Sequence, residues 1–180
     1  QNLRMGAAID PEVAAQPNAT ATGDDTVVTN TTNIDDEDGV TIPASIIAGQ
    51  ATSFNVAVSN TSGAAATLYG FVDWNRDGDF LDTGETASTV LVNGFFGSTT
   101  LGFNVPATAV TGQDLGARFR LSTSTSLTAT NNAPDGEVEQ GVKLGPVERG
   151  ALRGALHLDE SPGAGDHHVH VGLGPHVLLV

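Results

Sequence analysis

The strongest constraint on the fold is the alternation of polar and apolar residues over 53–60, which read Ser-Phe-Asn-Val-Ala-Val-Ser-Asn. A period of two places every second side chain on the same face, so this run predicts a half-buried β-strand. Other short runs bounded by turn residues predict strands at 40–42, 66–72, 89–92, 99–106 and 117–122. No segment carries a useful 3.6-residue apolar stripe. We therefore predict an all-β chain folded as an antiparallel β-sandwich.

The 180 residues suit one domain with tails and divide into three zones. Residues 1–38 are rich in acids and contain one base, Arg4, so we expect an extended acidic arm or linker. Residues 39–142 hold the predicted strands and form the folded body. Residues 143–180 form an atypical tail that holds all five His. Two interpretations of this tail are open: a functional terminal segment, and coding sequence read out of frame.

The net charge of −14, from 21 acids and 7 bases, excludes several partners. Such a field repels nucleic acid and anionic membranes, so we expect neither a nucleic-acid partner nor membrane insertion. No apolar run reaches the roughly 18 residues of a membrane-spanning helix. The sequence has no Cys, so no disulfide supports the fold. This agrees with a bacterial surface protein that uses a metal ion as its cross-link.

Residues 73–79, Asp-Trp-Asn-Arg-Asp-Gly-Asp, place an oxygen-bearing side chain at every second position and a Gly after the third. This spacing is typical of the first half of an EF-hand loop, and Ca²⁺ takes six to eight oxygen ligands. The pattern departs at its twelfth position, which is Gly84, with Glu85 one residue later. The preceding strand favours a Ca²⁺ loop on a β-scaffold, and an ordinary β-turn is the alternative. The predicted ligands are Asp73, Asn75, Asp77, Asp79, Asp82 and Glu85.

The predicted folded body lacks the usual catalytic groups. It contains no Cys nucleophile, no Gly-x-Ser-x-Gly motif and no His, the commonest general base. We therefore expect that the protein is not an enzyme.

Several motifs together resemble the GEVED domain, a β-rich module of large secreted and surface-anchored bacterial proteins. They span roughly residues 20–140 and include Asp35-Asp36-Glu37-Asp38-Gly39-Val40, Phe71-Val72-Asp73-Trp74-Asn75-Arg76-Asp77-Gly78-Asp79-Phe80 and Asp135-Gly136-Glu137-Val138-Glu139. The family pattern continues Glu-Asp-Tyr and then a final strand, whereas this chain continues Glu139-Gln140-Gly141. The resemblance implies that the closing strand comes from the tail or from another molecule, because an incomplete sandwich exposes an edge.

Two acidic runs, 35–38 and 135–139, each border a predicted strand and could meet at one end of the sandwich. They give a possible second metal site, and a solvated acidic rim is the alternative. Its candidate ligands are Asp36, Asp38, Asp135, Glu137 and Glu139. Arg118 and Arg120 flank Phe119, so we expect both to face outward and pair with the acidic loops. Trp74 is expected to pack behind the 73–79 segment, with sugar stacking as the alternative.

The sequence thus predicts a non-catalytic, Ca²⁺-stabilised extracellular module of a bacterial adhesin or surface protein. Its expected partners are neighbouring domains of the same protein, copies of itself, or glycans. Two alternatives stay open. One is a subunit of a homopolymeric fibre assembled by strand exchange through the arm or tail, and the other is a carbohydrate-binding module.

Overall fold

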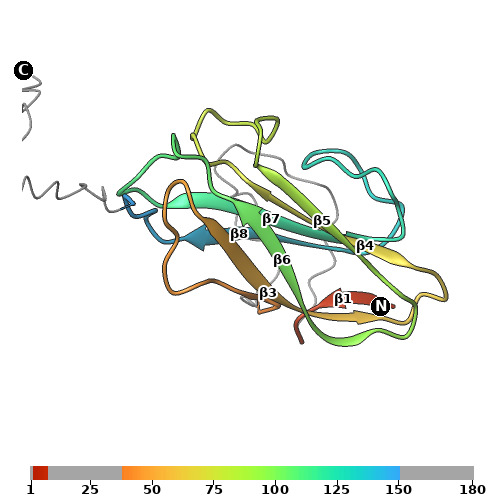
Figure 1. Cartoon of the computed structure of the whole chain (residues 1–180). Coiled ribbons are helices and arrows are strands. Elements are labelled where there is room, and N and C mark those ends of the chain that lie inside the picture. Colours follow the sequence, from red (N-terminus) through yellow and green to blue (C-terminus); the bar gives the residue numbers. More distant parts are fainter. Residues whose placement is uncertain (1, 8–37, 151–180) are drawn as a thin grey trace, which may run out of the picture.

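The computed structural model describes residues 2–7 and 38–150 of the chain. This part contains eight strands and no helix, and hence no helix that could cross a membrane. The strands form two antiparallel sheets packed face to face (Figure 1), which confirms the predicted β-sandwich. They are β1 (Leu3–Met5), β2 (Val40–Thr41), β3 (Ala51–Asn60), β4 (Ala66–Val72), β5 (Thr86–Leu91), β6 (Phe96–Asn104), β7 (Leu115–Ser122) and β8 (Glu137–Leu144).

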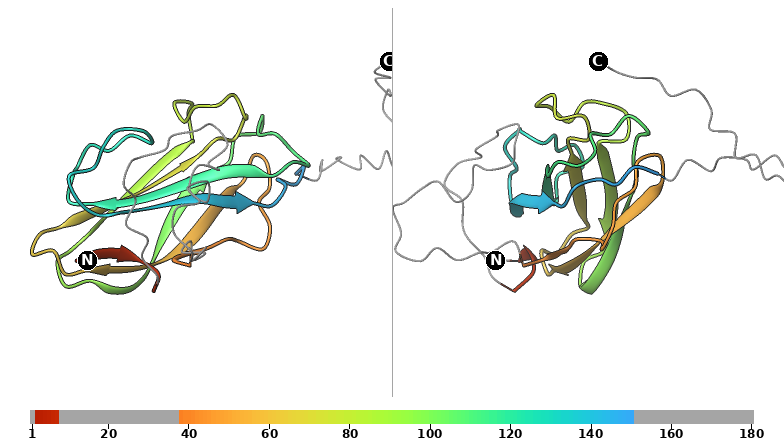
Figure 2. Two further views of the ribbon diagram at one scale, coloured as in Figure 1. Left: turned by 180° about the vertical axis from the view of Figure 1, so that it is seen from behind. Right: turned by 90° about the vertical axis from the view of Figure 1, so that its left-hand side faces the viewer.

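The first sheet is built around β3. Strand β6 pairs with β3 from Ala51 to Ser59, while β2 and β1 pair with it at Asn55–Val56 and Val58–Asn60. The second sheet has the strand order β5-β4-β7-β8. Figure 2 shows the two sheets as separate layers when the molecule is turned by 90°.

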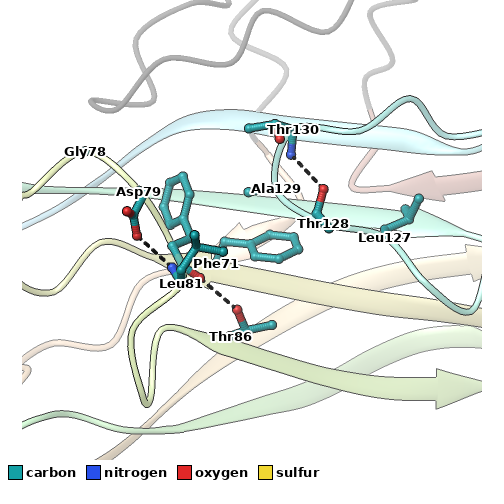
Figure 3. A pocket seen from close by; sticks show the side chains of 10 residues that line it. Phe71, Gly78, Asp79, Leu81, Thr86, Leu127, Thr128, Ala129 and Thr130 are labelled. Carbon is teal, nitrogen blue, oxygen red and sulfur yellow. Dashed lines mark hydrogen bonds between the residues drawn. The ribbon is translucent and has the colours of Figure 1, made fainter.

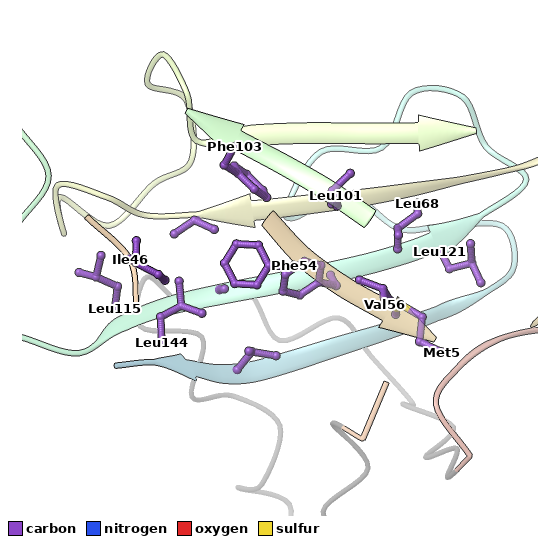
Figure 4. Packing of buried hydrophobic residues seen from close by; sticks show 14 of the residues in the cluster. Met5, Ile46, Phe54, Val56, Leu68, Leu101, Phe103, Leu115, Leu121 and Leu144 are labelled. Atoms are coloured by element: carbon purple, nitrogen blue, oxygen red, sulfur yellow. The ribbon is translucent and has the colours of Figure 1, made fainter. Parts of the chain in front are cut away.

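The core lies between the sheets and follows the period-two pattern. Along β3, Phe54, Val56 and Val58 are buried in one cluster with residues of the second sheet such as Leu68 and Phe119. Figure 4 shows Phe54, Val56 and Leu68 in this cluster. The Phe54 ring centroid lies 5.4 Å from that of Phe119 and 5.6 Å from that of Phe103. Every β4 residue is buried, so this strand is covered on both of its faces.

The outer face of β4 and β7 is covered by residues 123–136, called here the covering loop. Leu127 and Ala129 of this loop form a second apolar cluster with Tyr69, Phe71 and Phe80. The loop also covers Arg118 and Arg120, whose side chains are only 2% exposed each. Their Nη1 atoms donate hydrogen bonds to the carbonyls of Ala129 and Thr128. The two arginines therefore point away from the core, as predicted, but they lie under a loop and not in solvent.

The folded body extends beyond the predicted residues 39–142 at both ends. Strand β1 lies within the predicted arm, yet its residues Leu3 and Met5 belong to the core. At the other end, β8 runs to Leu144 and Val147 is buried. The closing strand β8 thus begins in the Gly-Glu-Val-Glu motif and pairs with β7 of the same chain, so it needs no second molecule. Residues 8–37 of the predicted arm, including Asp36, and residues 151–180 of the tail, including all five His, lie outside the described residues.

Candidate metal centre

The predicted Ca²⁺ ligands lie in the acidic loop, residues 73–85, which connects β4 to β5. The two ends of the loop are joined where the Val72 amide donates to the Glu85 carbonyl at 2.9 Å. The chain reverses at Arg76 and Gly78, which have φ values of +59° and +98°. The Gly78 amide then donates to Asp73 Oδ2 at 3.1 Å, which folds the loop back over Asp73. Gly suits the bend at residue 78 because it has no Cβ to oppose a positive φ.

The alternating Asn and Asp side chains support the backbone of the acidic loop. Asn75 Oδ1 accepts from the Asp77 amide at 3.0 Å, and Asp77 Oδ1 accepts from the Asp79 amide at 3.1 Å. Asp79 Oδ1 in turn accepts from the Leu81 amide at 2.9 Å. Each bond closes an Asx-turn, in which a side chain caps the amide two residues later. The period of two at these positions therefore has a role in the turn itself.

Two carboxylates are buried at the base of the acidic loop. Asp73 is 3% exposed and Glu85 is 1% exposed. Glu85 accepts from the Trp74 amide at 3.0 Å through Oε1 and from the Asp82 amide at 3.1 Å through Oε2. Asp73 Oδ1 is buried and has no hydrogen-bond partner among the described residues. Burial raises the pKa of both carboxyl groups above their ordinary values, and the charges of neighbouring acids act in the same direction.

The Asn75 amide joins two further acids of the loop. Its Nδ2 atom donates to Asp77 Oδ2 at 2.9 Å and to Asp82 Oδ2 at 2.6 Å. The nearby base, Arg76, donates instead to the side chain of Gln113. The N–H groups of the Asn75 side-chain amide thus lie between the Asp77 and Asp82 carboxylates. Their partial positive charge offsets part of the repulsion between these two acids.

The structure brings five of the six predicted ligands into one region. These are Asp73, Asn75, Asp77, Asp82 and Glu85, linked by the hydrogen bonds and charge interactions above. The carboxylate of Asp79 binds the Leu81 amide and lines a separate pocket. Within the described ranges, no three His, Cys, Asp or Glu side chains are arranged to hold a metal ion as they stand. The exposed side chains of Asp77 and Asp82 would therefore have to rotate to complete a metal site.

The structure divides the second predicted set of acids. Glu137 and Glu139 lie opposite Leu121 and Phe119 of β7, so they share the inward face of the sheet. Glu137 Oε2 accepts from the Met5 amide, and Glu139 Oε1 accepts from the Gly39 amide at 3.1 Å. These acids anchor the chain at β1 and just before β2.

Of the other members of that second set, Asp38 also lies beside β1, whereas Asp135 lies at the end of β7. Asp38 accepts from the Ala7 amide at 2.9 Å, also beside β1. Asp135 accepts from Ser122 Oγ at 2.6 Å and from the Thr123 amide at 3.0 Å, at the end of β7. Burial acts to raise the pKa of Asp135, but these hydrogen bonds outweigh it and lower the pKa below its ordinary value. Asp36 lies outside the described residues.

The aromatic side chains expected for a sugar site are covered. Trp74 is 1% exposed and Tyr69 is 7% exposed, so neither ring offers a free face to a sugar. Trp74 packs behind the acidic loop, and its Nε1 donates to the Gly84 carbonyl at 2.9 Å. An apolar pocket between the acidic loop and the covering loop was not predicted from the sequence. Its two sides lie about fifty positions apart in the chain, and no local pattern connects them.

Comparison with known proteins gives a family match over part of the chain. No curated protein matches the chain. The family model of the GEVED domain matches residues 67–140, a segment that spans most of β4, the acidic loop, β5, β6, β7 and the start of β8. The resemblance inferred from the motifs is thereby confirmed over residues 67–140, the segment that the GEVED family model matches.

Proposed function

We propose that this chain is a non-catalytic β-sandwich module of an extracellular bacterial surface protein, stabilised by Ca²⁺ bound at the acidic loop. The observation that carries this proposal is Asp73, which is buried with Oδ1 lacking a hydrogen-bond partner in the described structure. It lies beside a second buried carboxylate, Glu85, at the base of a loop that also holds Asp77 and Asp82.

The energetic argument is that burying carboxylates is unfavourable unless a positive charge or hydrogen bonds compensate them. The raised pKa values of Asp73 and Glu85 reflect this cost at neutral pH, and a divalent cation would remove it. The donors offered are oxygens alone, which suits a hard cation such as Ca²⁺. The proposed ligands are the side chains of Asp73, Asn75, Asp77, Asp82 and Glu85, with Asp79 contributing through its backbone carbonyl.

An extracellular location is consistent with a weak Ca²⁺ site. Ca²⁺ sites of extracellular modules bind with dissociation constants on the order of 10⁻⁴–10⁻³ M, which suffices where Ca²⁺ is millimolar. The sequence contains no Cys, so a metal ion is the available cross-link for a chain that carries 21 acids. The GEVED family match over residues 67–140 supports this placement, because the resemblance to that family implies a module of secreted and surface-anchored bacterial proteins.

Calcium removal should measurably destabilise the full chain. A ligand present at about 100 times its dissociation constant stabilises the native state by about 2.7 kcal/mol, which corresponds to roughly 10 °C in melting temperature for a domain of this size. We expect that difference between about 10 mM Ca²⁺ and excess EDTA, measured by thermal unfolding followed by circular dichroism. An identical melting temperature in the two buffers would show that the acidic loop is only a turn.

Asp73→Asn provides the specific control for this experiment. It should abolish the response to Ca²⁺, yet in EDTA it should be no less stable than the parent chain because it removes a buried charge. Glu148→Gln removes an exposed acid that lies outside the acidic loop and should keep the full response. A Ca²⁺ response that survives Asp73→Asn would place the ion elsewhere.

A second candidate function is the assembly of copies into a fibre by strand exchange. It is favoured by the packing of β1 in the core and its pairing with β3. Leu3 and Met5 fill the core at 2% and 0% exposure, and β1 is joined to β3 by hydrogen bonds such as Gly6 amide to Ala57 carbonyl at 3.0 Å. Residues 8–37 separate β1 from the next described residue, and a chain of that length can reach up to about 100 Å. The β1 segment of a neighbouring copy could therefore occupy the same position.

A designed disulfide distinguishes exchanged from unexchanged β1. Arg4 pairs directly with Ser59 across β1 and β3, and the Cα separation of such pairs, about 5.5 Å, suits a disulfide. Because the sequence has no Cys, Arg4→Cys with Ser59→Cys creates the one possible bridge. If copies exchange β1, oxidised protein should run as a ladder of covalent oligomers on non-reducing gels. If the variant oxidised at high protein concentration runs only as a disulfide-bonded monomer, strand exchange is ruled out.

A further inference from the structure

An apolar pocket of about 400 Å³ lies between the acidic loop and the covering loop (Figure 3). Gly78, Asp79, Phe80 and Leu81 supply one wall, and Leu127–Thr130 supply the other. Phe71 of β4 also lines it, and Thr86 at the start of β5 adds a hydroxyl group. Pockets of 300–1,000 Å³ with mainly apolar walls and a few polar groups are typical of binding sites.

The two walls of the pocket are held in place by the rest of the fold. Arg118 and Arg120 of β7 donate hydrogen bonds to carbonyls of the covering loop, at Ala129 and Thr128. On the other side, Thr86 Oγ1 at the start of β5 donates to the Phe80 carbonyl at 3.4 Å. The pocket is therefore a formed cavity between two fixed loops, so a ligand entering it meets a preorganised surface.

One lining residue is far more exposed than folding requires. Leu81 is 86% exposed, whereas Phe80, Leu127 and Ala129 are each at most 8% exposed. A large apolar side chain in water gains little from the fold of its own chain, and it gains free energy when a ligand covers it. Its place in the pocket lining makes Leu81 the natural contact for an incoming apolar group.

The charge of the pocket selects among possible apolar ligands. Asp79 is the ionisable residue of its lining, and the chain as a whole carries a net charge of −14. At this pocket an acidic second copy would bring like charge toward Asp79, whereas a basic polypeptide would be attracted. The apolar walls leave few partners for sugar hydroxyls, which disfavours a glycan in this pocket.

We propose that this pocket binds an aromatic or branched aliphatic side chain of a partner polypeptide, flanked by Lys or Arg that face Asp79. The apolar side chain would lie on Phe71, Phe80 and Leu127, with Leu81 closing over it. The pocket shares residues 78–81 with the acidic loop, but the side chains proposed to contact the peptide are not those proposed to bind Ca²⁺.

The experiment uses the ¹⁵N-labelled full chain titrated with acetyl-Lys-Phe-Lys-amide and, separately, with the neutral peptide acetyl-Ser-Phe-Ser-amide. Amide signals of Gly78–Leu81 and Leu127–Thr130 should shift saturably with the basic peptide and more weakly with the neutral one. The difference should shrink as salt is added, since exposed charges are screened. Absence of saturable shifts, or equal binding of both peptides, would overturn the proposal.

Matched variants locate the binding in the pocket. Leu81→Ser should weaken the basic peptide about fivefold or more, because it removes apolar contact area from an exposed position. Thr130→Tyr should also weaken it by filling the cavity from an exposed position. Val92→Ser changes an equally apolar, 68% exposed residue outside the pocket and should have no effect. Unchanged affinity in both pocket variants, with their spectra still folded, would refute the assignment.

Discussion

Gly136→Ala should lower the free energy of unfolding by about 4 kcal/mol, a large effect for one added methyl group. Gly136 precedes β8 and passes directly over the backbone of β7. A Cβ placed there would lie 1.7 Å from the Leu121 carbonyl oxygen, so β8 would have to move. Its φ of +100° is also strained for any residue with a side chain. The same displacement of β8 would move Glu137 and Glu139, and so weaken the hydrogen bonds that they accept from the Met5 and Gly39 amides.

Gly63→Ala separates the two causes of this loss. Gly63 has a similar φ of +90°, but an added Cβ would meet nothing within 4 Å. It should therefore cost only the backbone strain, about 1–2 kcal/mol. Urea unfolding of both variants measures the difference, and hydrogen exchange should show lost protection along β8 in Gly136→Ala alone. Equal costs for the two substitutions would mean that the close approach at Leu121 is not what requires Gly136.

The elements that the sequence predicted best are those whose pattern is local. The alternation over 53–60 gave β3 and its inward residues Phe54, Val56 and Val58, because a period of two directly encodes which side of a strand is buried. The acidic loop was likewise visible, since its Asx-turns join residues two positions apart. In both cases the interacting groups are neighbours in the sequence.

The features that the sequence could not predict depend on contacts between distant segments. Strand β1 is three residues long, and its pairing partner lies more than fifty residues away. Nothing near Leu3 or Met5 indicates that both belong to the core. The surroundings of Arg118 and the apolar pocket depend on the covering loop folding back over β7. The inward direction of Glu137 and Glu139 follows from the register of β8 on β7, which includes an irregularity between Ala117 and Phe119.

Trp74→Ala should cost about 3–5 kcal/mol, the usual range for deleting a buried Trp side chain. Trp74 is 1% exposed, and its ring packs edge-on against Phe103 with centroids 6.0 Å apart. Its Nε1 holds the Gly84 carbonyl, and its own carbonyl accepts from the Val110 amide at 2.8 Å. The residue thus joins the acidic loop to the core and to the segment that follows β6. Its removal should leave a cavity and loosen the acidic loop at the same time.

Trp74→Phe distinguishes these two contributions. Phe keeps most of the packing against Phe103 but loses the hydrogen bond to Gly84, so we expect a cost of about 1–2 kcal/mol. Because Trp74 is the single Trp of the chain, urea unfolding has to be followed by far-UV circular dichroism and not by Trp fluorescence. If the acidic loop is anchored through Nε1, Trp74→Phe should also weaken the response to Ca²⁺, whereas Phe54→Leu, a core change that leaves the Nε1 hydrogen bond in place, should not. Equal costs for Trp74→Phe and Trp74→Ala would mean that the Nε1 hydrogen bond, and not core packing, accounts for the stability that Trp74 provides.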